Sequence, residues 1–223
     1  MKREIIVTSD GSYTLFVPEL NESYHSTYGA VGESMHIFIN AGFRYVAKNF
    51  KKLTILEIGF GTGLNAFLTL LEIAGKETEI YYHGIEAYPV EKSDAEQLNY
   101  PEVSGFPKAA QLFEKLYTTE WGIKQAVSNN FSLLKEKNRL EEAILPADFY
   151  NLVYFDAFSP EVQPEMWRIE IFRKIYSAMK PDGVLVTYSC KGDVKRALKS
   201  VGFKIEKLPG PPGKREFLRA VKL

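Results

Sequence analysis

Three carboxylate residues in this sequence could hold a ligand or accept a proton: Glu57, Glu86 and Asp156. Each ends or follows a short apolar run without polar alternation, which is typical of a strand buried on both faces of a parallel sheet. Ligands of such sheets bind outside the carboxyl ends of the strands, near the point where the strand order reverses. We therefore expect Asp156 to stand at the reacting end of a ligand pocket.

A glycine-rich turn follows the first of these strands. Gly59, Gly61 and Gly63 alternate after Glu57, and an apolar pattern of helical spacing begins at Leu64. Glycine permits positive φ and a close approach of a ligand to the backbone, and the start of a helix offers free N–H groups. The turn is therefore a candidate binding site, although a turn that only packs is the alternative.

Two features favour S-adenosylmethionine (SAM) over a dinucleotide such as NAD. The turn reads E-x-G-x-G-x-G, and Asn65 stands where the dinucleotide pattern could place a further glycine for helix packing. Glu86 follows the turn at about the 20-residue distance at which an acid binds ribose hydroxyls. Glu57 and Glu86 would flank one adenosine, which fits a cationic cofactor without phosphates.

The elements that must position these residues alternate between strand and helix. This alternation predicts an α/β doubly wound, Rossmann-like sheet of about seven strands, the last one antiparallel. Two further β-prone runs flank Asp10-Gly11, which predicts a hairpin extension at the N-terminus. The strands of the main sheet are expected within residues 53–56, 80–85, 123–127, 152–155, 184–189, 204–208 and 217–221.

Asn129 and Asn130 are the candidates for the adenine contact. They stand in a polar turn between the expected strand 123–127 and an expected helix over 132–142. In folds of this kind that turn meets the adenine, whose exocyclic amine needs an acceptor such as an amide oxygen.

A second long helix is expected over 164–178.

Composition limits the class of protein. The 223 residues suit one sizeable domain, and the single cysteine, Cys190, indicates an intracellular, reducing compartment. No window approaches eighteen apolar residues, so we expect no membrane segment. From Arg168 to Leu223 there are 14 Lys and Arg against 5 Asp and Glu, a balance of +9 in a neutral chain. This asymmetry fits a polyanionic partner, with solvated helix faces as the alternative.

With these features, the chain resembles the SAM-dependent methyltransferases of the tRNA 5-methylaminomethyl-2-thiouridine family. These enzymes methylate the aminomethyl group of the modified wobble uridine, and the activity also occurs as the N-terminal half of a bifunctional enzyme fused to a flavin-dependent oxidase. The resemblance rests on four motifs: HSTYGAVGESMHIFI at 25–39, EIGFGTGLN at 57–65, FDAFSPEVQPEMW at 155–167 and GPPGKREFLRA at 210–220.

The resemblance implies a role for each matched residue. Asp156 would lie beside the transferred methyl, where its carboxylate accepts hydrogen bonds from the substrate amine. The cofactor would be SAM, bound by Glu57, Gly59, Gly61, Gly63, Asn65 and Glu86. Lys214 and Arg215 would lie near the tRNA entrance. Further candidates for contact with the tRNA anticodon loop are His25, Tyr28, Glu33 and Phe158.

The resemblance also implies an organisation for the whole chain. Residues 1–50 would form a hairpin and a helix that pack on a methyltransferase domain of residues 51–223. We expect a cytoplasmic protein without metal, and we expect that any oxidase activity comes from a separate protein. Two alternatives stay open: a small-molecule amine methyltransferase or aminopropyltransferase on the same fold, and a non-catalytic SAM-fold binding protein.

Overall fold

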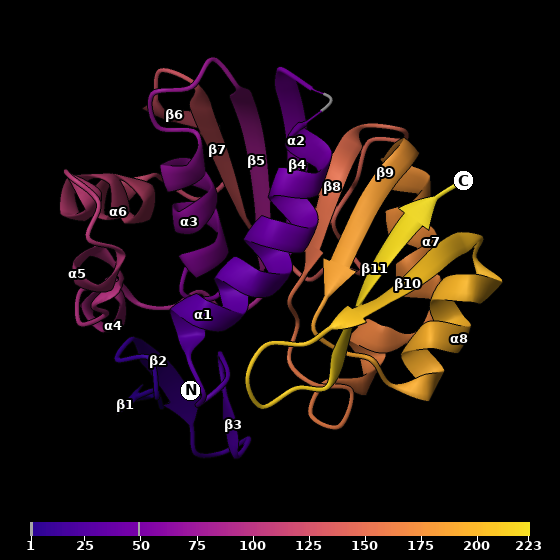
Figure 1. The fold of residues 1–223 in the computed structure, drawn as a ribbon, viewed down its shortest axis with the longest axis horizontal. Helices are drawn as coiled ribbons and strands as arrows, with labels where there is room; N and C mark the ends of the chain where they lie inside the picture. The colour runs from indigo at the N-terminus through magenta and orange to yellow at the C-terminus, as the bar shows by residue number, and fades with distance from the viewer. Residues whose placement is uncertain (1, 49) are drawn as a thin grey trace.

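A computed structural model describes residues 2–48 and 50–223, which form one large sheet between two layers of helices and a smaller sheet at one end (Figure 1). The large sheet has eight described strands in the order β10-β11-β9-β8-β4-β5-β7-β6. They are β4 (Lys52–Ile58), β5 (Glu79–Glu86), β6 (Gln125–Ser128), β7 (Phe131–Lys137), β8 (Tyr150–Phe155), β9 (Met179–Thr187), β10 (Phe203–Pro209) and β11 (Glu216–Lys222).

The centre of the sheet is parallel. The strands β7, β5, β4, β8 and β9 run in one direction, while β11 is antiparallel to both of its neighbours. Every residue of β8 is buried, as the apolar run at residues 152–155 predicts. The chain moves outward from β4 through β5 to β7 and then returns to β8 on the other side of β4. The strand order therefore reverses at β4 and β8, and a ligand site is expected at their carboxyl ends.

One part of the predicted sheet is wrong. The expected helix over 132–142 is instead the parallel strand β7, and the expected third strand is the antiparallel edge strand β6. Phe131, Leu133 and Lys135 are buried in β7 while the residues between them are more exposed, which is the two-residue period of a strand. Lys135 hides this period in the sequence, because a lysine is normally expected at an exposed position. Its ammonium group can be buried here because it donates hydrogen bonds to the carbonyls of Leu116 and Tyr117.

Helices cover both faces of the sheet (Figure 1). One face packs against α3 (Leu64–Glu72), α6 (Ala109–Thr118) and the π-helix η1 (Met35–Phe43), which continues α1 (Ala30–Ser34) and leads into α2 (Arg44–Ala47). The other face packs against α7 (Ile169–Ala178) and α8 (Gly192–Ser200). The short helices α4 (Lys92–Ala95) and α5 (Tyr100–Ser104) follow β5.

The predicted helix over 164–178 is divided. The 3-10 turn η2 (Pro164–Trp167) ends at Arg168, whose backbone is extended, and α7 begins after it. No helix in the described part of the chain is long and apolar enough to cross a bilayer.

The N-terminal hairpin is confirmed and extended by a third strand. The strands β1 (Glu4–Val7) and β2 (Tyr13–Val17) pair antiparallel, and β2 also pairs with β3 (Glu22–Ser23). The chain then enters α1 and η1. Gly42 of η1 lies so close to the sheet that an added Cβ would be 3.0 Å from a methyl group of Val186. Close packing of this helix on the sheet holds the small sheet beside the carboxyl ends of β4 and β8.

Candidate functional site

A cleft of about 450 Å³ opens at the carboxyl ends of β4, β5 and β8. Its other walls include the segment from β3 to α1, the residues after β7, the turn η2 and the loop between β10 and β11. The structure thus brings together parts of the chain that are distant in sequence. The predicted site residues that line the cleft are His25, Tyr28, Glu33, Gly59, Gly61, Glu86, Asp156, Phe158 and Lys214.

The glycine turn forms the floor of the cleft. Gly59 has φ +82°, and a Cβ there would lie 2.5 Å from the carbonyl oxygen of Asp156. Gly61 has φ +49°, and a Cβ would lie 3.1 Å from the ring of Tyr24. Side chains are therefore excluded where a ligand would approach. Gly63, also at positive φ, caps α3 and packs against Leu116 instead of lining the cleft.

A buried network of hydrogen bonds, made by side chains that do not line the cleft, fixes the carboxylate of Asp156. The amide nitrogen of Asn65 donates to Asp156 Oδ2 at 2.8 Å and to Glu57 Oε1 at 2.9 Å. The Tyr82 hydroxyl donates to the other carboxylate oxygen of Glu57 at 2.8 Å. Glu57 is only 1% exposed, and neither Glu57 nor Asn65 lines the cleft. In this arrangement Glu57 and Asn65 do not contact a ligand but position Asp156 and the glycine turn.

Burial changes the acidity of these carboxyl groups. It raises the pKa of Glu57 well above its ordinary value, and the pKa of Asp156 to about 7. The nearby Glu33 raises the pKa of Asp156 further, whereas the Asn65 hydrogen bond and the charge of Lys214 lower it. Because a general base works best when its pKa is near the working pH, Asp156 can exchange a proton with a substrate at neutral pH.

Glu86 ties the glycine turn to the segment after β5. Its carboxylate accepts a hydrogen bond from Gly61 N and another from Tyr88 N, each at 2.9 Å. Burial raises the pKa of this carboxyl group, and the two backbone donors oppose the rise. Its place at the end of β5 is where the sequence predicts a ribose contact.

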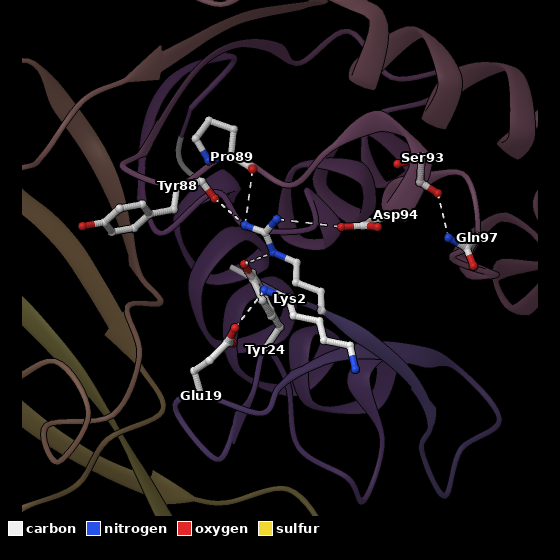
Figure 2. Close-up of polar contacts among 9 residues, drawn as sticks. Lys2, Glu19, Tyr24, Tyr88, Pro89, Ser93, Asp94 and Gln97 are labelled. Carbon is white, nitrogen blue, oxygen red and sulfur yellow. Dashed lines mark hydrogen bonds and ion pairs between the residues drawn. The ribbon is translucent and has the colours of Figure 1, made fainter.

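Arg3 joins the small sheet to the rim of the cleft. Figure 2 shows its partners Tyr24, Tyr88, Pro89 and Asp94 grouped around one guanidinium group. Its guanidinium group donates to the Tyr24 hydroxyl at 3.0 Å and to the carbonyl oxygens of Tyr88 at 2.8 Å and Pro89 at 3.3 Å. A carboxylate oxygen of Asp94 in α4 lies 3.8 Å from it. Tyr24 and Tyr88 both line the cleft, so a single cation fixes two of its walls.

The opposite wall carries an ion pair. Glu33, 8% exposed, accepts a hydrogen bond from Ser26 N at 2.9 Å and pairs with the ammonium group of Lys214. This ammonium group also lies 4.1 Å from the centre of the Tyr188 ring. The Tyr188 hydroxyl donates to the carbonyl oxygen of Ala157 at 2.9 Å, which places the ring beside Asp156.

The remaining predicted substrate residues differ in their surroundings. His25 is buried and bonded to the Thr14 hydroxyl at 2.9 Å, and burial lowers its pKa to about 4, so it is neutral at pH 7. Tyr28 is 59% exposed at the mouth. The ring of Phe158 contacts Tyr24 edge-on, with 5.1 Å between ring centres. Arg215 is exposed and lies outside the cleft lining.

The adenine contact predicted for Asn129 and Asn130 needs correction. The two residues form the turn between β6 and β7, at the amino end of β7, and the Asn130 amide donates to Lys76 O at 2.9 Å and Thr78 O at 3.0 Å. The cleft is at the other end of the sheet. Asn138, directly after β7, does line it, and the backbone N–H of Asn138 donates to Glu86 O at 3.1 Å. No pattern in the sequence identified Asn138, because the buried Lys135 hides the two-residue period of β7.

The residues present fit SAM better than a dinucleotide. Six carboxylate side chains line the cleft and only two basic ones, Arg139 and Lys214. Such a lining attracts a cationic sulfonium and repels a pyrophosphate. In the described residues no group of three or more His, Cys, Asp or Glu could hold a metal ion.

Two bacterial proteins are similar to the chain over most of its length. One is the tRNA 5-methylaminomethyl-2-thiouridine biosynthesis bifunctional protein MnmC of Pseudomonas savastanoi, which is 28% identical over 221 residues, covering 90% of this chain and 32% of that protein. The protein of the same name from Magnetococcus marinus is 29% identical over 220 residues, covering 93% and 32%. The chain therefore spans about a third of the length of these relatives. The resemblance found in the four motifs is confirmed.

Solved structures show the same likeness. The chain superposes on MNMC2 from Aquifex aeolicus with a TM-score of 0.75 and 27% identity, covering 98% of this chain and 70% of that one. The SAM-bound magnesium protoporphyrin IX methyltransferase of Synechocystis, at 13% identity and a TM-score of 0.53, shares the fold, covering 87% and 81%.

The family follows from the C-terminal part of the sequence together with the fold. A family described as S-adenosyl-L-methionine-dependent methyltransferase matches residues 107–223 of the 223. This match covers more than half of the chain and includes β8, which carries Asp156 at its end. SAM is accordingly the cofactor, as the glycine turn and Glu86 predict. The chain belongs to the family of S-adenosyl-L-methionine-dependent methyltransferases.

Proposed function

We propose that this enzyme methylates the nitrogen of the 5-aminomethyl group on the modified wobble uridine of tRNA, giving 5-methylaminomethyl-2-thiouridine or its unthiolated form. The observation that carries the proposal is the position of Asp156. Its carboxyl group has a pKa near 7 and faces an acidic cleft in a chain similar to MnmC proteins along nearly its whole length. The reaction would take place in the cytoplasm.

Asp156 would prepare the substrate amine. A primary alkyl amine is mostly protonated in water, and it can attack a methyl group only after losing that proton. SAM, when bound, supplies the methyl group on a sulfonium. The Asp156 carboxylate accepts hydrogen bonds from the amine, directs its lone pair and accepts the proton. Asn65 and Glu57 hold Asp156 in place, and such positioning can lower a barrier by roughly 7–11 kcal/mol.

The tRNA contacts would come from a small part of the basic C-terminal third. Within that segment Lys207 pairs with Glu216, Arg219 with Glu206 and Lys222 with Asp148, so their charges are partly neutralised inside the protein. We propose that phosphate contacts come from Lys195 and Lys199 on α8 and from Arg215 in the exposed loop before β11. Tyr28 and Phe158 offer rings at the cleft on which a splayed base could stack.

The test is methyl transfer from labelled SAM to tRNA isolated from a strain that lacks the gene, followed by nuclease digestion and nucleoside mass analysis. We expect label on an aminomethyluridine. Asp156→Asn should lower the rate by about 10²–10⁴-fold, the usual contribution of a general base. Asp182→Asn is the matched control, because Asp182 is exposed near the start of β9 at φ +60°, a conformation that Asn accepts.

Two outcomes would contradict the proposal. Unlabelled tRNA together with labelled small amines would identify a small-molecule transferase. SAM binding without any transfer, to tRNA or to amines, would identify a non-catalytic binding protein.

A further inference from the structure

The ion pair between Lys214 and Glu33 lies inside the cleft, beside the proposed base. The Lys214 ammonium group has the buried carboxylate of Glu33 on one side and the ring of Tyr188 on the other, 4.1 Å from the ring centre. Glu33, Tyr188, Lys214 and Asp156 all line the same cavity. A protein group with the charge and shape of an alkylammonium ion therefore occupies part of the substrate cleft.

The surroundings of this ammonium group are those that bind alkylammonium ligands in general. A carboxylate supplies the opposite charge, and an aromatic face attracts the cation through its quadrupole, with more effect where water is excluded. Asp156 takes part electrostatically, since Glu33 raises and Lys214 lowers the pKa of its carboxyl group. The Tyr188 ring is anchored through its hydroxyl to Ala157, the residue after Asp156.

We propose that Glu33, Tyr188 and Asp156 form the subsite for the ammonium group of the substrate, and that the Lys214 ammonium group fills this subsite until a substrate replaces it. This inference rests on the proposed function in one respect, namely that the substrate is a primary amine. It gives Lys214 a role different from a fixed phosphate contact at the tRNA entrance.

The Lys214 side chain can leave the subsite without unfolding of the loop that carries it. Lys214 N donates to Pro211 O at 2.9 Å and Gly210 N donates to Arg215 O at 3.0 Å, so the turn keeps its backbone. Figure 1 shows this loop, between β10 and β11, reaching toward the N-terminal segment. The flexible stem of a lysine lets the ammonium group leave while the turn stays in place.

The exchange would select for amines that are attached to a polyanion. A free alkylamine must displace Lys214 and leave its charge without a partner. An amine on tRNA brings phosphates that can receive the displaced ammonium group. Lys214 would thus exclude the small cationic amines of the cell from an acidic cleft that otherwise attracts them.

The probe for the subsite is ethylammonium chloride, with sodium chloride at equal ionic strength as the reference. Binding is measured by calorimetry on the SAM-loaded protein, without tRNA. We expect Lys214→Met to bind ethylammonium at least tenfold more tightly than the wild type. Adding Glu33→Gln to this variant should remove the gain. Lys207→Met is the matched control, because Lys207 pairs with Glu216 on the surface, away from the cleft.

Equal ethylammonium binding by the wild type and Lys214→Met would overturn the proposal. So would a loss of about one unit in the salt slope of tRNA binding without any gain for ethylammonium, since this identifies a phosphate contact. Thermal unfolding checks that each variant is folded. If Lys214→Met does not fold, Lys214→Gln, which can form a hydrogen bond with Glu33, is used in its place. Because the ethylammonium titration uses neither tRNA nor turnover, it remains decisive if tRNA proves not to be the substrate.

Discussion

Asp156 illustrates how one residue can lower stability while serving the site. Its pKa is about 7 in the folded chain and near 3.8 when exposed to water. Between these pH values the folded chain keeps a proton that the unfolded chain releases. The contribution of this group to the free energy of unfolding therefore falls as the pH rises from about 4 to about 7, and it stays low above pH 7.

Asp156→Asn is expected to remove this loss. At pH 8 the free energy of unfolding of the variant should exceed that of the wild type by on the order of 1–3 kcal/mol, since one pKa unit corresponds to about 1.4 kcal/mol. At pH 5 the difference should be smaller. Thermal unfolding at the two pH values measures it. A variant less stable than the wild type at pH 8 would show that the Asp156 charge is stabilised, not penalised, by its surroundings.

Asn65 acts on the reaction through Asp156. Its amide donates to Asp156 and Glu57 together and thereby lowers the pKa of both carboxyl groups. Asn65→Ala should therefore move the rising limb of kcat/KM to higher pH, by roughly one unit. A pH–rate profile measures the shift. Asn151→Ala is the control, because Asn151 is also buried and bonded to Thr54 but lies at the other end of β8; the same shift in both variants would exclude a specific role of Asn65.

At the scale of elements, the small N-terminal sheet depends on Arg3 for its position. Arg3→Met removes donors to Tyr24 and Tyr88 and should weaken SAM binding by about tenfold, since a hydrogen bond from a charged group contributes about 1.5–3 kcal/mol. Calorimetric titration with SAM tests this. Lys2→Met, which removes an exposed neighbouring cation paired with Glu4, should leave the affinity unchanged. Equal affinities of Arg3→Met and the wild type would show that the small sheet does not shape the cofactor site.

The elements also show where sequence patterns were sufficient. The strand β4, which contains Glu57, and the strand β8, which Asp156 follows, are mostly apolar, so their type was predictable. The strand β7 was not, because Lys135 is a charged residue at a buried position. Its burial depends on the carbonyls of α6, which come from a distant part of the chain. The predicted adenine contact of Asn129 and Asn130 was wrong for the same reason, since these residues precede β7 and the cleft lies at its other end.

At the scale of the whole molecule, the division into residues 1–50 and 51–223 stays a prediction. The buried core that includes Leu15 and Phe38 also includes Ile55 and Leu64, so apolar contacts cross that boundary continuously. The charge asymmetry of the sequence is partly balanced in the fold by ion pairs between the C-terminal third and earlier residues, such as Lys222 with Asp148. A count of charges in the sequence therefore overstates the basic surface available to tRNA.

The sequence by itself determined the fold class, the glycine turn, the cofactor and the carboxylates at the ends of β4, β5 and β8. These follow from local patterns, because strand ends and glycine spacing depend on neighbouring residues alone. Tertiary structure decided that Glu57 lies behind Asp156, that Lys214 lies against Glu33 and Tyr188, and that Asn138 replaces Asn130 at the cleft. These relations depend on contacts between segments far apart in the chain, and no local pattern encodes how such segments meet.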